Sequence, residues 1–284
     1  DGPVIGVALD GTGYGPDGTV WGGEILIADS GHFERIAHFR QVPLPGGEQA
    51  IKQPWRIALS YLDVAFGDRL WDLPIPFVRD LDRPTTEVLR RAVRQGINSP
   101  RTSSCGRLFD AVAALVGIRQ TTTYEGQAAM ELETAMDHCV TSNFFCDDAY
   151  PIVHVDGEAA APMSTLRTTP NRFACQPFVL DPIPLIEAVI ADIRTTASVS
   201  VISRRFHHGL VRSLASAVGR VANESGVGQV VLNGGCMQNR FLRNALMNTL
   251  EQMGLSVFTP QSTPPNDGGL ALGQILIASE IASA

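Results

Sequence analysis

The sequence predicts an α/β protein, and three observations carry this prediction. Apolar runs of strand length at residues 4–9 and 229–232 are bounded by glycine-rich or polar turns. Stretches at residues 204–224 and 239–253 have the apolar spacing of helices. The order strand, glycine turn, helix, strand over residues 229–259 implies a right-handed βαβ crossover, and therefore a parallel sheet.

The composition is that of a globular protein. The 284 residues are 44% hydrophobic and 18% charged, which argues against long disordered or fibrous segments. The length suffices for two ordinary lobes. The chain opens on Asp1, and an apolar run begins three residues later, so we expect it to be an N-terminally truncated piece of a longer protein.

Charge and cysteine content restrict the partners and the compartment. Lys and Arg total 22 against 29 Asp and Glu, a net charge of −7, which disfavours nucleic acid and anionic membranes as partners. No apolar run of about 18 residues predicts a membrane span, and no signal peptide is visible. The five cysteines form no CxxC pair, so we expect a reducing cytoplasm, buried thiols and no cysteine nucleophile; they are Cys105, Cys139, Cys146, Cys175 and Cys236.

In the first half of the chain, strands are expected to precede helices. The turn Pro16-Asp17-Gly18 separates the first strand from strands at 25–28 and 36–40, and a helical period follows over 49–65. Further helices are expected at 84–93, begun by a threonine cap and ended at Gly96, at 103–117, with Asp110 off the centre of its apolar stripe, and at 128–139.

In the second half, residues 140–181 read as irregular, apart from a strand at 152–155. Helices are expected at 184–195, 204–224 and 239–253, and a last helix follows Gly269. Strands at 229–232 and 256–259 flank the third of these helices.

Three polar, glycine-containing turns are the candidate functional sites, because ligands of α/β sheets gather where strands end. They are Asp10-Gly11-Thr12-Gly13, Asn233-Gly234-Gly235 and Asn266-Asp267. Small residues let backbone N–H groups approach an anion, and Asp10 with Asp267 could form half of a metal site. The plainer alternatives are hairpin glycines that permit positive φ and an acid that caps a helix. From the residues alone, the prediction is a nucleotide or anion site between two lobes.

The sequence gives little support for a histidine-based metal site or for a serine hydrolase. The six histidines show no i, i+4 pair for metal ligation; His207 and His208 are adjacent, and we expect one to be buried and the other solvated. Ser103 and Ser104 lack the Gly-x-Ser-x-Gly elbow of a serine hydrolase.

Five separated motifs together resemble the C-terminal domain of the HypF family, the carbamoyltransferases of NiFe-hydrogenase maturation. The resemblance spans nearly the whole chain, and five motifs in the family's order are far more specific than any one of them. The motifs are Leu9-Asp10-Gly11-Thr12-Gly13, Ser103-Ser104-Cys105-Gly106-Arg107, Tyr124-Glu125-Gly126-Gln127, Asn233-Gly234-Gly235-Cys236 and Asn266-Asp267-Gly268-Gly269.

The resemblance implies an ASKHA fold, the actin-like ATPase type with ribonuclease-H-like lobes, similar to the tRNA-modifying enzyme TsaD. It implies that residues 1–284 are a TsaD-like carbamoyltransferase domain, without the upstream acylphosphatase-like, zinc-finger and YrdC-like regions. In the family, the YrdC-like domain makes carbamoyl-adenylate from carbamoyl phosphate and ATP. The domain resembled here passes the carbamoyl group to the C-terminal cysteine of HypE, a step toward the cyanide ligands of the hydrogenase.

Carried over by position, the resemblance also implies site residues. Asp10 and Asp267 correspond to acidic metal ligands with a catalytic role, for iron or zinc, with Mg²⁺ as a further candidate. The family's two metal-binding histidines would lie upstream of Asp1, so this piece is expected to hold the metal weakly and to be inactive alone if they are essential. The implied nucleotide-binding residues are Gly11, Thr12, Gly13, Asp110, Gly126, Gly234, Gly235 and Asn239.

Three other functions are alternatives to carbamoyl transfer to HypE. An O-carbamoyltransferase of the nodulation or antibiotic-tailoring kind would share the fold and the donor but modify a hydroxyl. A sugar kinase of the same fold would need a catalytic base and γ-phosphate loops that the sequence does not place. A non-catalytic nucleotide- or partner-binding fragment is disfavoured by the polar residues at the strand ends.

Overall fold

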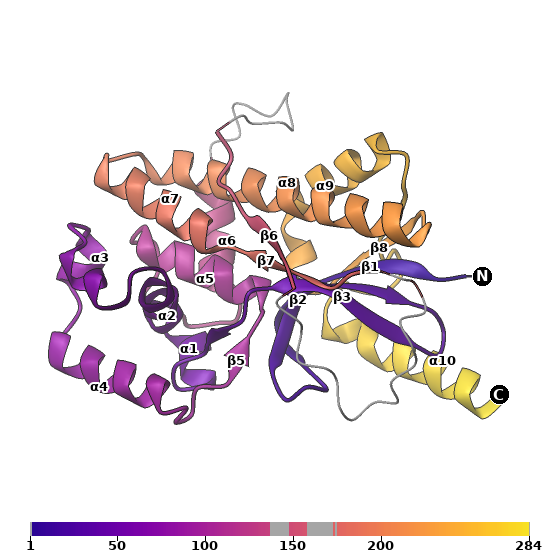
Figure 1. Ribbon diagram of the computed structural model, residues 1–284, viewed down its shortest axis with the longest axis horizontal. Coiled ribbons are helices and arrows are strands. Elements are labelled where there is room, and N and C mark those ends of the chain that lie inside the picture. Colours follow the sequence, from indigo (N-terminus) through magenta and orange to yellow (C-terminus); the bar gives the residue numbers. More distant parts are fainter. Residues whose placement is uncertain (1, 137–147, 158–172, 174, 284) are drawn as a thin grey trace.

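The computed structural model describes residues 2–136, 148–157, 173 and 175–283. Within these residues a nine-stranded mixed sheet forms the centre of the molecule, and its main path runs β6-β7-β3-β2-β1-β8-β9 (Figure 1). Strands β4 and β5 pair with each other beside β2. The strands are β1 (Val4–Tyr14), β2 (Val20–Ala28), β3 (Phe33–Phe39), β4 (Val42–Pro43), β5 (Arg101–Thr102), β6 (Val153–Asp156), β7 (Phe178–Asp181), β8 (Gln229–Asn233) and β9 (Ser256–Phe258).

The sheet combines an antiparallel meander with a parallel edge. Strands β1, β2 and β3 pair antiparallel in chain order, whereas β8 runs parallel to both β1 and β9. Along β1, Ile5, Val7 and Leu9 are fully buried and alternate with less buried residues, as a half-covered strand requires. The predicted α/β class and the parallel pairing on either side of helix 240–252 are both confirmed.

Helices cover the sheet and continue beyond its left end as seen in Figure 1. There α2 and α5 contact each other, while α7, α8 and α9 lie above the sheet and α10 below it in this view. One apolar core joins the sheet to α2, α5, α7, α8 and α9. The helices are α1 (Glu48–Lys52), α2 (Pro54–Phe66), α3 (Pro76–Arg79), α4 (Arg83–Arg94), α5 (Cys105–Leu115), α6 (Gln127–Thr134), α7 (Ile183–Arg194), α8 (Val199–Ser225), α9 (Arg240–Gln252) and α10 (Leu270–Ser283), with short 3-10 turns η1 (Gly67–Asp72), η3 (Gly235–Gln238) and η4 (Asp267–Gly269).

Several predicted boundaries were wrong for identifiable reasons. The expected helix over 49–65 is two helices, because Pro54 lacks an N–H and begins α2 afresh. Helix α4 is capped by the carboxylate of Asp82, which accepts a hydrogen bond from the Thr85 N–H at 3.0 Å, not by a threonine. Gly96, with φ 68°, does end this helix region as expected.

The second half differs in two further respects. Strand β7 was not predicted, since only four residues pair in it, although they pair with both β3 and β6. Helix α8 begins five residues before the expected start. The end of the helix expected at 128–139 lies outside the described residues, as do Cys139 and Cys146. None of the helices in the described part of the chain has the length and apolar character needed to cross a bilayer.

Candidate functional site

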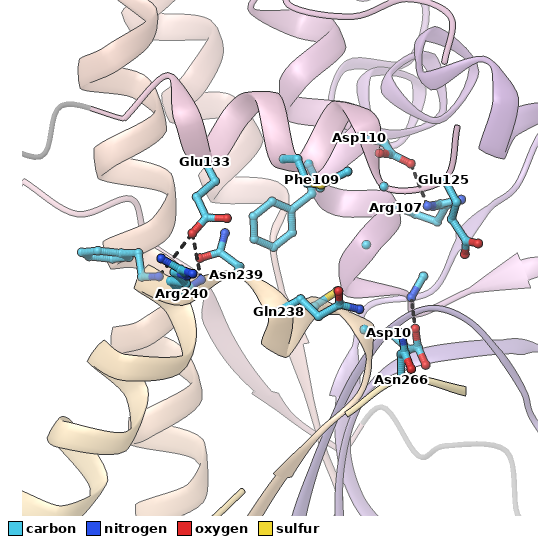
Figure 2. A pocket seen from close by; sticks show the side chains of 18 of the residues that line it. Asp10, Arg107, Phe109, Asp110, Glu125, Glu133, Gln238, Asn239, Arg240 and Asn266 are labelled. Carbon is cyan, nitrogen blue, oxygen red and sulfur yellow. Dashed lines mark hydrogen bonds and ion pairs between the residues drawn. The ribbon is translucent and has the colours of Figure 1, made fainter. Parts of the chain in front are cut away.

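A cavity of about 1090 Å³ opens where β8 ends and β1 leaves its parallel pairing with it. This volume lies at the upper end of the range of about 300 to 1,000 Å³ that is typical of ligand pockets, so the cavity has room for a ligand of nucleotide size. Figure 2 shows side chains from β1, α5, α6, α9 and the turns η3 and η4 converging on it. The lining residues with functional groups are Asp10, Arg107, Asp110, Glu125, Glu133, Cys236, Gln238, Asn239, Arg240, Asn266 and Asp267.

A bulge in β1 places Asp10 at the cavity. The register between β1 and β2 shifts between the pairs Leu9–Gly23 and Gly13–Trp21, so three residues of β1 stand opposite the single residue Gly22. Such bulges redirect side chains. The three residues were expected in a loop after the strand, but they lie within β1, because the hairpin resumes its pairing beyond them.

Helix α5 is fixed to this bulge at its first turn. The Ser104 hydroxyl caps the helix by accepting from the Arg107 N–H at 3.1 Å, and it lies 2.8 and 2.7 Å from the carbonyl oxygens of Asp10 and Gly11. A Cβ on Gly106 would lie 2.8 Å from the Gly11 Cα, so only glycine permits this approach. The α5 N-terminus and the β1 bulge therefore form one rigid wall of the cavity.

The opposite wall comes from the C-terminal part of the chain. Gly234 turns from β8 into η3 with φ 102°, and a Cβ there would lie 2.1 Å from the Leu9 carbonyl oxygen. Its N–H donates to the Pro265 carbonyl at 2.7 Å, which joins η3 to the loop before η4. Asn266 then caps η4 by accepting from the Gly268 N–H at 3.1 Å. These bonds hold Asp267 at the cavity beside β1.

The carboxylates of Asp10 and Asp267 are close enough to influence each other. Burial raises the pKa of Asp10, the N–H groups of Gly11 and Gly235 oppose that rise, and the charges of Asp267 and Glu125 add to it. Two converging carboxylates suit a hard cation, whose charge would remove their repulsion. Among the described residues, however, no group of three His, Cys, Asp or Glu side chains is arranged to hold a metal. Within the described residues, the two carboxylates therefore offer only part of a ligand set for a metal ion.

Arg107 and Asp110 form a buried ion pair on one face of α5. Arg107 Nη2 lies 2.9 Å from Asp110 Oδ2, and the two residues are only 3% and 2% exposed. Burial raises the pKa of Asp110 to about 6, and the Arg107 charge opposes this rise. Asp110 thus borders the cavity as a carboxylate that already has one partner.

Asn239 is held on both sides of its amide group. Its Oδ1 caps α9 by accepting from the Leu242 N–H at 2.8 Å, and its Nδ2 lies 3.0 Å from His207 Nε2. His207 Nδ1 lies 2.7 Å from the Ser203 carbonyl, which can only accept, so Nδ1 carries the hydrogen and Nε2 accepts from Asn239. The carboxylate of Glu133, on α6, accepts from the Arg240 N–H at 2.8 Å across the cavity rim (Figure 2).

A second buried carboxylate lies behind the bulge. Glu24 on β2 is 1% exposed and accepts from the N–H groups of Gly22 and Gly23 at 2.6 and 2.7 Å and from the Ser103 hydroxyl. Burial raises its pKa to about 7, although these hydrogen bonds oppose the rise. Glu24 holds the strand and the start of α5 together without bordering the cavity.

The structure brings most of the predicted site residues to one place. Asp10, Gly11, Asp110, Gly126, Gly235, Asn239 and Asp267 all line the cavity. Thr12, Gly13 and Gly234 do not, since Gly13 pairs with Trp21 in the sheet and Gly234 packs on Leu9. A role for these three in nucleotide binding stays a prediction.

Sequence reasoning missed several cavity residues and misjudged one histidine. Arg107, Glu125, Glu133 and Gln238 line the cavity, and the only signal for Arg107 was a charge inside an otherwise apolar helix. His207 and His208 are both buried, because α8 is covered on both of the faces they occupy. Cys105 and Cys175 are buried as expected, while Cys236 is half-buried and borders the cavity.

Fold and site together define a class: an ASKHA-type α/β domain with an acid-lined cavity between its sheet and its helices. Residues 6–274 match the family described as "Carbamoyltransferase, Kae1-like Domain, second subdomain" of HypF. The chain belongs to this family.

Sequence relatives and solved structures agree with the assignment. The chain is 38% identical to carbamoyltransferase HypF2 of Cupriavidus necator over 98% of its own length, and 34% identical to carbamoyltransferase HypF of Synechocystis over 96%. It spans 34% of the length of each of these two relatives. A crystal structure of full-length HypF in a phosphate- and nucleotide-bound form matches the whole chain with a TM-score of 0.86 at 36% identity, and the chain covers 40% of it. The T. kodakarensis HypF structure matches 99% of the chain and 34% of its own, with a TM-score of 0.78 at 28% identity.

Proposed function

We propose that the cavity binds carbamoyl-adenylate, the product of ATP and carbamoyl phosphate on a YrdC-like domain of the same protein. The domain then transfers the carbamoyl group to the C-terminal cysteine thiol of HypE in the cytoplasm. The observation that carries this proposal is the convergence of Asp10 and Asp267 on one cavity, in a chain that belongs to the HypF family. A relative with this fold has been crystallised with phosphate and nucleotide, which supports the class of ligand.

The residues on the cavity walls would contact different parts of the carbamoyl-adenylate. Asp110, Gly126 and Asn239 hold the ribose and base, and the backbone at Gly11 approaches the phosphate. The acceptor thiolate attacks the carbamoyl carbon, the carbon–sulfur bond forms, and the bond to the phosphate oxygen breaks as AMP leaves. A cation bound by Asp10 and Asp267 would supply charge neutralisation for the departing phosphate.

The nucleophile is expected from the partner protein. The side-chain hydrogen bond with Cys236 raises the pKa of Cys105, and burial adds to the rise, so this thiol stays protonated and unreactive. Cys236 borders the cavity, but the transfer needs an acceptor that departs with the carbamoyl group. A flexible C-terminal cysteine of a partner meets that need.

A transfer assay tests the proposal. The assay uses a full-length protein that carries this chain in three forms: unaltered, with Asp267→Ala and with Asp72→Ala. Each form is mixed with carbamoyl-adenylate, an iron or zinc salt and a peptide that ends in the acceptor cysteine. Asp72 is an exposed acid that does not line the cavity, so Asp72→Ala serves as the matched control. Mass spectrometry follows the gain of one carbamoyl group on the peptide.

We expect Asp267→Ala to slow transfer by about a hundredfold or more, because it removes half of the carboxylate pair, and Asp72→Ala to leave it unchanged. Equal rates for all three proteins would remove Asp267 from the mechanism. No transfer by the unaltered protein would favour a non-catalytic binding domain, and transfer to a hydroxyl in place of the thiol would favour an O-carbamoyltransferase.

A further inference from the structure

Arg107 is a buried cation at the cavity whose hydrogen-bonding capacity is largely unused. It lies in the first turn of α5, is 3% exposed and lines the cavity. Nη2 pairs with Asp110, but Nε and Nη1 are enclosed and have no hydrogen-bond partner in the described structure. Buried donors are nearly always satisfied, so two unpartnered nitrogens on one guanidinium need an explanation.

The charge of the cavity indicates what Arg107 is for. Among the described residues, the charged side chains of the lining are two arginines and five acids, and the acids are Asp10, Asp110, Glu125, Glu133 and Asp267. The other arginine, Arg240, is exposed, so Arg107 is the one buried cation of this lining. An anionic ligand is repelled by five carboxylates, and a cation with free donors inside the wall lowers that barrier.

The position of Arg107 indicates which part of a ligand it would meet. Nη2 is the atom nearest to where a Cβ on Gly11 would lie, at 3.6 Å, so the guanidinium lies beside the backbone expected to approach the phosphate. In Figure 2 its tip lies between Asp110 and Glu125. Asp110 engages Nη2, the nitrogen common to both bidentate edges of the planar group, so Nε and Nη1 remain as two separate single donors.

We propose that Arg107 binds a phosphate oxygen of the adenylate and thereby distinguishes a nucleotide from its nucleoside. This rests on the proposed function, since it assigns a residue to the phosphate of that same ligand. A rotation of the guanidinium away from its enclosed position would present one of these donors, Nη1 or Nε, to a phosphate oxygen. Asp110 holds the group in register during this change. The alternative is that Arg107 only neutralises Asp110 and has no contact with the ligand.

The two roles predict different binding behaviour. AMP and adenosine share the ribose and base and differ in the phosphate, so the ratio of their dissociation constants isolates the contact in question. The experiment measures both constants by isothermal titration with the full chain. The variants are Arg107→Gln, Arg107→Lys and the control Arg94→Gln, whose exposed arginine lies on α4.

We expect Arg107→Gln to weaken AMP binding by about tenfold or more while adenosine changes less than about twofold, as loss of one charge-assisted bond predicts. Arg107→Lys keeps the positive charge but lacks the guanidinium donors, so its loss of AMP affinity should lie between those of the unaltered protein and Arg107→Gln. Arg94→Gln should change neither dissociation constant. If Arg107→Gln does not fold by circular dichroism, Arg107→Lys is compared instead, and a larger loss for AMP than for adenosine supports the proposal.

Two results would overturn it. Equal losses for AMP and adenosine would mean that Arg107 acts only through Asp110, and an unchanged AMP affinity would mean that it does not meet the phosphate; either leaves the proposed function intact. If the unaltered chain binds neither ligand, this inference and the proposed function fail together.

Discussion

Asp10 and Asp267 show how far single residues could be interpreted from sequence. They lie near opposite ends of the chain, yet each comes after an apolar run in the sequence, and the expectation that ligands gather at strand ends pairs them; in the structure both line one cavity. Arg107 was missed because its neighbours form a helix that is buried on all sides, so its charge gave no sign of which face it occupied. Only the three-dimensional packing shows that this face borders the cavity.

Glu24 yields a prediction about pH. Its pKa is about 7 in the folded protein against an ordinary value of 4.5, so between these values the folded state holds a proton that the unfolded state has released. Stability should therefore fall as the pH rises from about 4.5 through 7. From pH 5.5 to pH 8 this one group accounts for about 2 kcal/mol.

Urea unfolding at the two pH values measures this effect. Glu24→Gln should lose about 2 kcal/mol less than the unaltered protein over the interval, since the amide does not ionise. The exposed Glu187→Gln, on α7, is the control and should behave like the unaltered protein. If Glu24→Gln and the unaltered protein showed the same pH dependence of the free energy of unfolding, ionisation of Glu24 would not affect stability.

At the scale of elements, most helices and strands followed from the apolar period, whereas their ends depended on contacts that sequence does not show. The β1 bulge is the clearest case. Glycines after an apolar strand predict a turn, but here the pairing of Gly13 with Trp21 extends the strand past them. The bulge carries Asp10, so the error in the element and the position of the site have the same physical origin.

The N-terminus of α9 gives a prediction for a single cap. Asn239→Ala removes both the cap on α9 and the bond to His207, and should lower the free energy of unfolding by about 1–2 kcal/mol. Asn239→Asp keeps the cap but loses the donor to His207, so it should fall between the two proteins. Denaturant unfolding measures all three, and a fully stable Asn239→Ala would mean that water replaces both bonds.

The turn from β8 into η3 gives a prediction for a glycine. Gly234→Ala should destabilise the fold by about 3 kcal/mol or more, because the added Cβ meets the Leu9 carbonyl oxygen and the residue has φ 102°. Gly228→Ala is the matched control, since its Cβ would meet nothing within 4 Å and its φ is not positive. Thermal unfolding of the two variants distinguishes a steric clash at Gly234 from a general destabilisation by alanine in place of glycine. Equal melting temperatures for Gly234→Ala and Gly228→Ala would contradict the packing described at Leu9.

At the scale of the molecule, the sequence predicted the α/β class from residues 229–259, and the resemblance supplied the ASKHA type. The cavity itself could not be predicted, because its walls come from segments separated by more than a hundred residues along the chain. They meet through a few specific bonds, such as Ser104 with the Asp10 carbonyl and Gly234 with the Pro265 carbonyl.

We propose that the carbamoyl group is transferred in this cavity, and blocking the cavity tests this most directly. Ala129 on α6 lines the cavity, so the indole ring of Ala129→Trp should obstruct the part of it beside α6 without altering any of the charged groups. Ala191→Trp, on the exposed side of α7, makes the same change elsewhere.

In a single-turnover reaction with carbamoyl-adenylate and the acceptor peptide, AMP release and peptide carbamoylation are measured together. The unaltered protein and Ala191→Trp should release one AMP for each carbamoylated thiol, and Ala129→Trp, folded by circular dichroism, should yield neither product. Full activity in Ala129→Trp would contradict the assignment of the reaction to this cavity.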